Sequence, residues 1–113
     1  RYSIAIENTS KPDYWTEKIS DCFLSGTVPL YFGATNLSDY FPAESFIWLP
    51  LDKPEEAIRT VRRVIAEDDF SSRLGALQEA KDLVLQKYSL YSQISAIATE
   101  EQVAISLSRV HTR

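Results

Sequence analysis

The chain lacks several residue types and motifs, and each absence excludes a class of protein. Its 113 residues include one cysteine and one histidine, so neither an intrachain disulfide nor a zinc site of the usual kind can form. No apolar run reaches about 18 residues, so no membrane-spanning helix is expected. The three glycines form neither a P-loop nor a GxGxxG fingerprint, which argues against NTP hydrolysis and dinucleotide binding.

Positive charge is also scarce. Lysine and arginine number 12 against 16 aspartate and glutamate residues, which gives a net charge of -4. Because nucleic-acid backbones require clustered cations, we expect no nucleic-acid partner. No signal peptide is visible. No methionine occurs, even at residue 1, so we expect a piece of a longer protein.

The hydrophobic fraction, 44%, is enough for one domain with a buried core. Apolar and β-branched residues predict strands at 2–6 and 28–32, the second apolar on both faces as in a covered parallel sheet. Between them, a helix is predicted from about Tyr14 or Thr16 to Ser25. Its apolar face comprises Ile19, Cys22, Phe23 and Gly26. This strand–helix–strand order predicts an α/β fold with a right-handed crossover.

After the second strand, residues 33–42 read as a loop with one helical turn from Leu37, followed by a third strand at 45–49. Asp52 is predicted to cap the next helix, with Glu55 as its capping-box partner. The buried stripe of that helix is predicted to be Ala57, Ile58, Val61, Val64 and Ile65.

The remainder is predicted to be helical. The expected helices run from Phe70 to about Gln86, from Leu90 to Ala98 and from Glu100 to about Val110. We therefore expect a single unit with an α/β core at 1–52 and a helical tail at 53–113.

Chemistry is expected at the carboxyl ends of the first two strands, because open α/β sheets bind ligands there. The helix start faces the same side, and its N–H groups and Lys18 suit a diphosphate. Glu17 can accept hydrogen bonds from sugar hydroxyls, and Tyr14 can stack on a ring or donate a hydrogen bond. These parts predict a sugar-nucleotide pocket. The alternative is that these residues bind no ligand. In that case Glu17 complements the helix dipole, Lys18 is solvated at the surface and Tyr14 packs against the protein.

The chain resembles the α-1,3-fucosyltransferases of glycosyltransferase family 10 over about residues 2–49. The resemblance lies in an ordered series of segments. They are Glu7-Asn8-Thr9, Asp13-Tyr14-Trp15-Thr16-Glu17-Lys18, Ser25-Gly26-Thr27-Val28-Pro29-Leu30, Gly33-Ala34-Thr35-Asn36 and Phe41-Pro42-Ala43-Glu44-Ser45-Phe46-Ile47.

The resemblance implies the Rossmann-like C-terminal domain of a two-domain GT-B enzyme, which binds GDP-fucose while an N-terminal domain binds the acceptor glycan. It implies an inverting transfer whose general base lies upstream, so we expect weak donor binding and no catalysis by this chain alone. No tightly bound cofactor or metal is expected, although a loosely bound divalent cation would assist the diphosphate. The donor-binding residues implied by position are Glu7, Asn8, Tyr14, Thr16, Glu17 and Lys18.

Two departures from the family pattern carry further expectations. The insert Ser10-Lys11-Pro12 lacks the cysteine common in animal and plant members, which favours a bacterial relative. Trp15 replaces a smaller β-branched residue, so its bulk is expected to reshape the pocket. A bacterial protein would act in the cytoplasm or at the cytoplasmic membrane face, and a eukaryotic one in the Golgi lumen. Two alternatives stay open: another sugar nucleotide, or a non-catalytic carbohydrate- or partner-binding module.

Overall fold

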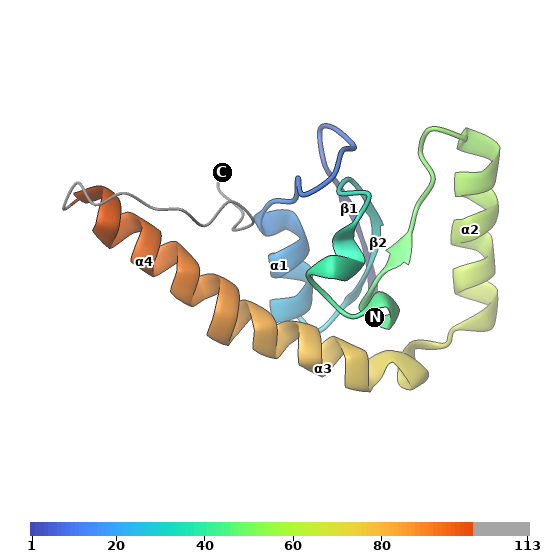
Figure 1. Ribbon diagram of the computed structural model, residues 1–113. Helices are drawn as coiled ribbons and strands as arrows, with labels where there is room; N and C mark the ends of the chain where they lie inside the picture. The colour runs from blue at the N-terminus through green and yellow to red at the C-terminus, as the bar shows by residue number, and fades with distance from the viewer. Residues whose placement is uncertain (101–113) are drawn as a thin grey trace.

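The computed structural model describes residues 1–100, which form a three-stranded parallel sheet and four α-helices (Figure 1). The strands, in sheet order, are β1 (Tyr2–Ile6), β2 (Val28–Phe32) and β3 (Ile47–Trp48). Ile6 pairs with Phe32, so the carboxyl ends of β1 and β2 lie at one edge of the sheet. The predicted parallel α/β unit is confirmed.

Helix α1 (Glu17–Leu24) connects β1 to β2 and covers the sheet with one apolar face. Ile19 and Phe23, one turn apart, are both fully buried. Cys22 is half-buried and accepts a hydrogen bond from Ser3 Oγ at 3.2 Å, in keeping with its packing position. The chain leaves the helix through Gly26, whose φ of 73° is in the left-handed region that favours glycine.

The third strand is shorter than predicted. It was expected at 45–49, but only Ile47–Trp48 pairs with β2. Ser45 belongs to a 3-10 turn (Ala43–Ser45), because its hydroxyl donates to Pro42 O at 2.6 Å and holds the backbone away from the ladder. The helical turn expected from Leu37 is present as a second 3-10 turn (Leu37–Asp39).

Helix α2 (Pro54–Glu67) begins two residues after Asp52, so the predicted Asp52–Glu55 capping box is wrong. Proline disfavours helical backbone in the residue before it, and Lys53 accordingly has φ -129° and ψ 84°. Lys53 is therefore the N-cap, and it makes no side-chain capping hydrogen bond. Pro54 itself suits the first helical position because it has no N–H group to satisfy.

The buried stripe of α2 is also rotated from the prediction. Ala57, Thr60 and Val64 are buried, whereas Ile58 is 53% exposed and Ile65 is 71% exposed. Ala57 and Val64 were predicted correctly. The buried face of the helix is narrower than the predicted stripe, so Ile58 and Ile65 lie at the surface.

No break separates the helix predicted to end at about Gln86 from the helix predicted to begin at Leu90. Helix α3 (Leu74–Leu83) continues through a π-helical turn (Val84–Tyr88) into α4 (Ser89–Glu100). The π turn keeps the backbone bonded, with Ser89 N donating to Val84 O. It also brings Tyr88 to the core, where its hydroxyl donates to Tyr40 O at 2.9 Å. The helix predicted from Glu100 to about Val110 lies outside the described residues, except for Glu100.

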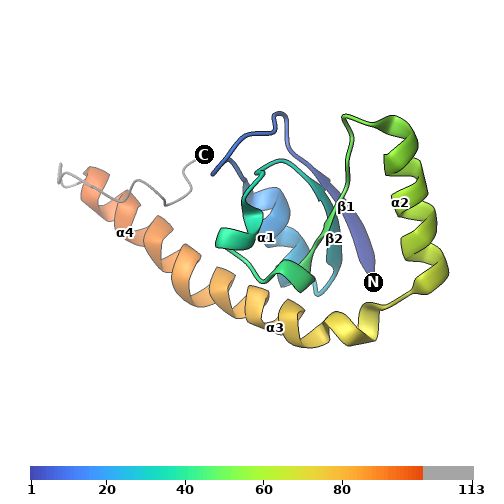
Figure 2. The same ribbon diagram turned by 45° about the vertical axis from the view of Figure 1, so that its right-hand side comes forward.

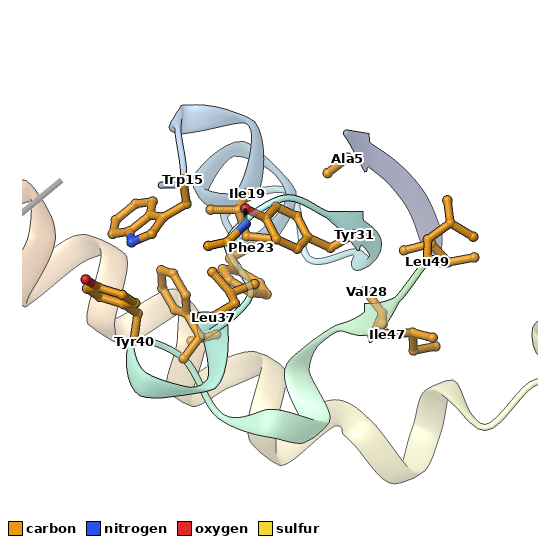
Figure 3. Close-up of a cluster of buried hydrophobic side chains, with 14 of the residues drawn as sticks. Ala5, Trp15, Ile19, Phe23, Val28, Tyr31, Leu37, Tyr40, Ile47 and Leu49 are labelled. Atoms are coloured by element: carbon orange, nitrogen blue, oxygen red, sulfur yellow. Dashed lines mark hydrogen bonds between the residues drawn. The ribbon is translucent and has the colours of Figure 1, made fainter. Parts of the chain in front are cut away.

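The core is a cluster of apolar side chains from the strands, from α1, α2 and α3, and from the loops between them (Figure 3). Tyr31, Phe23 and Phe41 are its largest fully buried members. In both ribbon views α1 and α2 lie on opposite sides of the strands, and α3 runs below them (Figures 1 and 2). Within the described chain, none of the helices has the length and apolar character needed to cross a bilayer.

Candidate functional site at the carboxyl edge of the sheet

Glu7, the residue after β1, is buried beneath the predicted site and makes hydrogen bonds to the residues around it. Its backbone N–H donates to Phe32 O at 2.8 Å, which extends the β1–β2 ladder by one residue. Its side chain is 3% exposed, and its carboxylate accepts from Thr16 N and Thr16 Oγ1, both at 2.7 Å, and from the Tyr31 hydroxyl at 3.3 Å. These contacts tie the end of one strand to the start of α1.

Thr16 is the N-cap of α1. Its hydroxyl oxygen accepts from Lys18 N at 3.3 Å while its hydrogen points to Glu7. The N–H groups at the start of this helix were expected to face an anion, but those of Thr16 and Lys18 already have acceptors inside the protein. An anion at this edge would therefore be attracted mainly by charged side chains and less by the amides at the start of α1.

Lys18 supplies that charge. Its ammonium donates to Ile6 O at 3.1 Å, so the side chain folds back from the first turn of α1 onto the carboxyl end of β1. Its only bonded partner there is a neutral carbonyl, and among residues 1–100 no carboxylate lies within salt-bridge distance of it. The charge is thus held at the edge where α/β proteins bind ligands.

Three further predicted residues lie around this edge. Asn8 and Glu17 are exposed, whereas Tyr14 is half-buried. The ammonium of Lys11 lies 5.4 Å from the centre of the Tyr14 ring, a cation–π contact that adds a second positive group beside the loop. The six predicted residues therefore divide into two supporting residues, Glu7 and Thr16, whose polar groups bond to each other, and an outer set, Asn8, Tyr14, Glu17 and Lys18.

A pair of residues absent from the predicted set connects this loop to the loop after β2. Asn36 Oδ1 accepts from Asp13 N at 2.7 Å, and Asn36 Nδ2 donates to Asp13 Oδ1 at 2.8 Å. The Tyr40 hydroxyl donates to the same Asp13 oxygen at 2.7 Å. Asp13 has φ 66°, a left-handed conformation that aspartate tolerates better than most residues. Both residues lie in segments of the family motif, but their spacing along the chain does not indicate that they pair.

Gly33 gives the edge its tight packing. A Cβ atom at this position would lie 2.4 Å from Glu7 Cγ and 2.4 Å from the Tyr31 hydroxyl oxygen. The Tyr31 oxygen also accepts from Ala34 N at 2.9 Å. Burial raises the pKa of Tyr31 above its ordinary value, and the nearby Glu7 carboxylate adds to the rise while the Ala34 N–H opposes it.

Trp15 does not contribute bulk to this edge, contrary to expectation. It is 3% exposed and packs edge-on against Tyr40, with ring centres 5.5 Å apart (Figure 3). Its ring also packs edge-on against Phe41 and Tyr88, with centres 5.3 Å away in both cases. The large side chain therefore fills the core beneath the Asp13–Lys18 segment.

The edge offers cations, hydroxyl-binding groups and an aromatic ring. Among the described residues no group of three His, Cys, Asp or Glu side chains could hold a metal ion. Its side chains suit an anionic ligand that also carries hydroxyls. Parallel strands joined by a helix define an open α/β fold, a class of fold in which ligands bind beyond the carboxyl ends of the strands.

The particular family follows from comparison with known proteins. The model of "Glycosyltransferase family 10 (fucosyltransferase) C-term" matches residues 1–73, so the chain belongs to this family. An α-(1,4)-fucosyltransferase of Arabidopsis thaliana is 47% identical over 47 residues, which cover 42% of this chain and 12% of that protein. The human 4-galactosyl-N-acetylglucosaminide 3-alpha-L-fucosyltransferase 9 is 34% identical over 67 residues, which cover 57% of this chain and 19% of that protein.

A solved structure shares the fold. The crystal structure of an alpha1,3-fucosyltransferase superposes with a TM-score of 0.55 at 20% identity, covering all of this chain and 34% of that one. The matches thus cover only 12–34% of the length of these relatives.

Proposed function

We propose that this chain forms the donor-binding part of an inverting GT-B glycosyltransferase that transfers fucose from GDP-fucose to an acceptor glycan. The observation that carries the proposal is the position of the Lys18 ammonium, 3.1 Å from the carbonyl at the end of β1. Membership of the fucosyltransferase family supports fucose as the transferred sugar.

Each predicted residue receives a role that fits its position. Lys18 neutralises the diphosphate, where negative charge grows as the sugar leaves. Exposed Glu17 accepts hydrogen bonds from ribose or fucose hydroxyls, and Tyr14 and Asn8 contact the nucleotide from the loop. Glu7 and Thr16, whose polar groups bond within the protein, hold the start of α1 in place and thereby position Lys18.

The reaction needs groups that we assign to an N-terminal domain. The bond from the fucose anomeric carbon to the diphosphate breaks as the acceptor oxygen attacks from the opposite face. A general base of that domain removes the hydroxyl proton. We therefore expect the 113-residue chain alone to bind donor weakly and to transfer nothing. A loosely bound divalent cation, the bacterial source and the cellular location remain predictions.

The test is a calorimetric titration of the full-length protein with GDP, GDP-fucose, UDP and ADP. The decisive variant is Lys18→Gln, which retains a donor for the Ile6 carbonyl but removes the charge. A lost charge-assisted contact is worth about 1.5–3 kcal/mol, so affinity for GDP should fall by about tenfold or more. Lys81→Gln, on α3, makes the same charge change away from the edge and should leave affinity unchanged.

Each outcome separates the alternatives. Preference for guanine nucleotides, weakened by Lys18→Gln alone, supports the donor site. Preference for UDP would keep a sugar-nucleotide transferase and discard fucose. Absence of binding by any nucleotide would overturn the enzyme and favour a non-catalytic carbohydrate-binding module on the same scaffold.

A further inference from the structure

A groove lies beside α2, and neither Glu7 nor Lys18 lines it. It is an open groove of about 510 Å³ between the end of β3 and one face of α2, here called the α2 groove. Its lining includes Trp48, Pro50, Lys53, Glu56, Arg59 and Arg63. The start of α2 and the loop after β1 lie at the same end of the molecule in both ribbon views (Figures 1 and 2).

The cations of the groove are not equally engaged. Lys53 pairs with Glu56 at 3.8 Å, and Arg63 lies 4.0 Å from Glu67. Arg59 has no carboxylate within salt-bridge distance in the described part of the chain, although it lies one helical turn from Arg63. One guanidinium therefore faces the groove with its donors available, and such a group is suited to a planar carboxylate.

An aromatic side chain and an acceptor complete the lining. Trp48 is half-buried, and its indole is held by the rings of Tyr31 and Phe32, with centres 6.2 and 5.6 Å away. Indole surface attracts the weakly positive C–H groups of a sugar ring through its quadrupole. Asp52, which also lines the groove, has no cation within salt-bridge distance among residues 1–100 and can accept from hydroxyls.

We propose that the α2 groove binds a sugar acid, a pyranose with one carboxylate, with the carboxylate on Arg59 and the ring against Trp48. Asp52 accepts hydrogen bonds from its hydroxyls. A nucleoside diphosphate fits less well, because Asp52 and Glu56 would repel a polyanion. If the proposed function holds, the sugar acid belongs to the acceptor or product glycan, and the groove extends recognition beyond the donor site.

The experiment compares two oligosaccharides that differ only at one end, glucuronic acid in one and glucose in the other. Both are titrated by calorimetry into the full-length protein without donor, so the result does not depend on transfer. We expect the acidic glycan to bind more tightly. Arg59→Ala should weaken it by about tenfold or more, since hydrogen bonds to charged groups contribute about 1.5–3 kcal/mol.

Arg62→Ala is the matched control, because Arg62 is an exposed residue of the same helix that does not line the groove. It should leave the affinity unchanged. Arg59→Lys, which keeps the charge but loses the planar fork, should fall between the wild type and Arg59→Ala.

A location signal completes the test. The indole N–H resonance of Trp48, assigned by its loss in Trp48→Phe, should shift with the acidic glycan. Equal binding of both glycans, equal losses in Arg59→Ala and Arg62→Ala, or no shift of Trp48 would each overturn the proposal. GDP binding that depends on Lys18 but not on Arg59 would leave the donor site intact, so the two proposals fail separately.

Discussion

At the scale of single residues, Gly33 has no room for a side chain. Gly33→Ala would place a methyl group 2.4 Å from Glu7 Cγ and from the Tyr31 oxygen, and both of these residues are buried. Overpacking of this kind costs about 1–3 kcal/mol, so the free energy of unfolding should fall by that amount in urea titrations. Gly75→Ala is the control, because a Cβ there meets no atom within 4 Å. Equal effects of the two substitutions would contradict the packing argument.

Tyr31 makes stability depend on alkaline pH. Its folded pKa lies above the unfolded value, so the stability it contributes is complete below about pH 10 and is lost as the pH rises above that. Tyr31→Phe should cost about 1–3 kcal/mol at pH 8, because Glu7 loses a donor and Ala34 N an acceptor.

The pH profile separates this titration from simple packing. The stability difference between wild type and Tyr31→Phe should shrink as urea titrations move from pH 8 toward pH 11. Tyr2, whose pKa is also raised by burial and by Asp69 and Asp68, is present in both proteins and cancels. Parallel curves for the two proteins would show that Tyr31 does not carry the proton linkage.

At the scale of elements, the sequence was informative where one local rule decided the outcome. Alternation and apolar runs predicted β1 and β2, and the spacing of Ile19 and Phe23 predicted α1. Errors arose where two rules competed: Pro54 overrode Asp52 as a helix-start signal. The π turn before Ser89 depends on Tyr88 reaching the core, a tertiary contact that periodicity does not contain.

The candidate site also combines features that the sequence predicted with features that depend on tertiary contacts. The family motif placed Glu7, Thr16 and Lys18 at one edge, and the structure brings them together. It did not indicate which of them face inward, because burial of Glu7 depends on Tyr31 from the neighbouring strand. The Asp13–Asn36 pair spans two loops, so spacing along the chain gave no sign of it.

That pair supports a prediction about how the two loops hold each other. Asn36→Asp would place a carboxylate between those of Asp13 and Asp39 and remove both amide donations. At neutral pH the free energy of unfolding should fall by about 1–3 kcal/mol. Near pH 4 part of the loss should return, since a protonated carboxyl can donate again. Asn8→Asp, the same change at an exposed position, should cost much less at either pH.

At the scale of the whole molecule, the described chain does not close around its sheet. Its radius of gyration is 15.2 Å, against about 13 Å for a compact chain of this length, because α3 and α4 run on beyond the strands (Figure 1). Ile4 and Ile6 alternate onto one face of β1 and are 61% and 39% exposed, while Ala5, on the other face, is buried. One face of an edge strand is therefore apolar and uncovered within residues 1–100.

This surface predicts self-association of the 113-residue chain through β1, because exposed apolar edge strands pair with one another. Sedimentation velocity should show species heavier than a monomer as the protein concentration rises. Ile4→Lys should return the chain to a monomer, because a charge on an edge strand opposes pairing. Ile97→Lys is the matched control: Ile97 is equally exposed, at 61%, but lies on α4. If Ile97→Lys alone returned the chain to a monomer, the interface would lie on α4, and the exposed face of β1 would not form it.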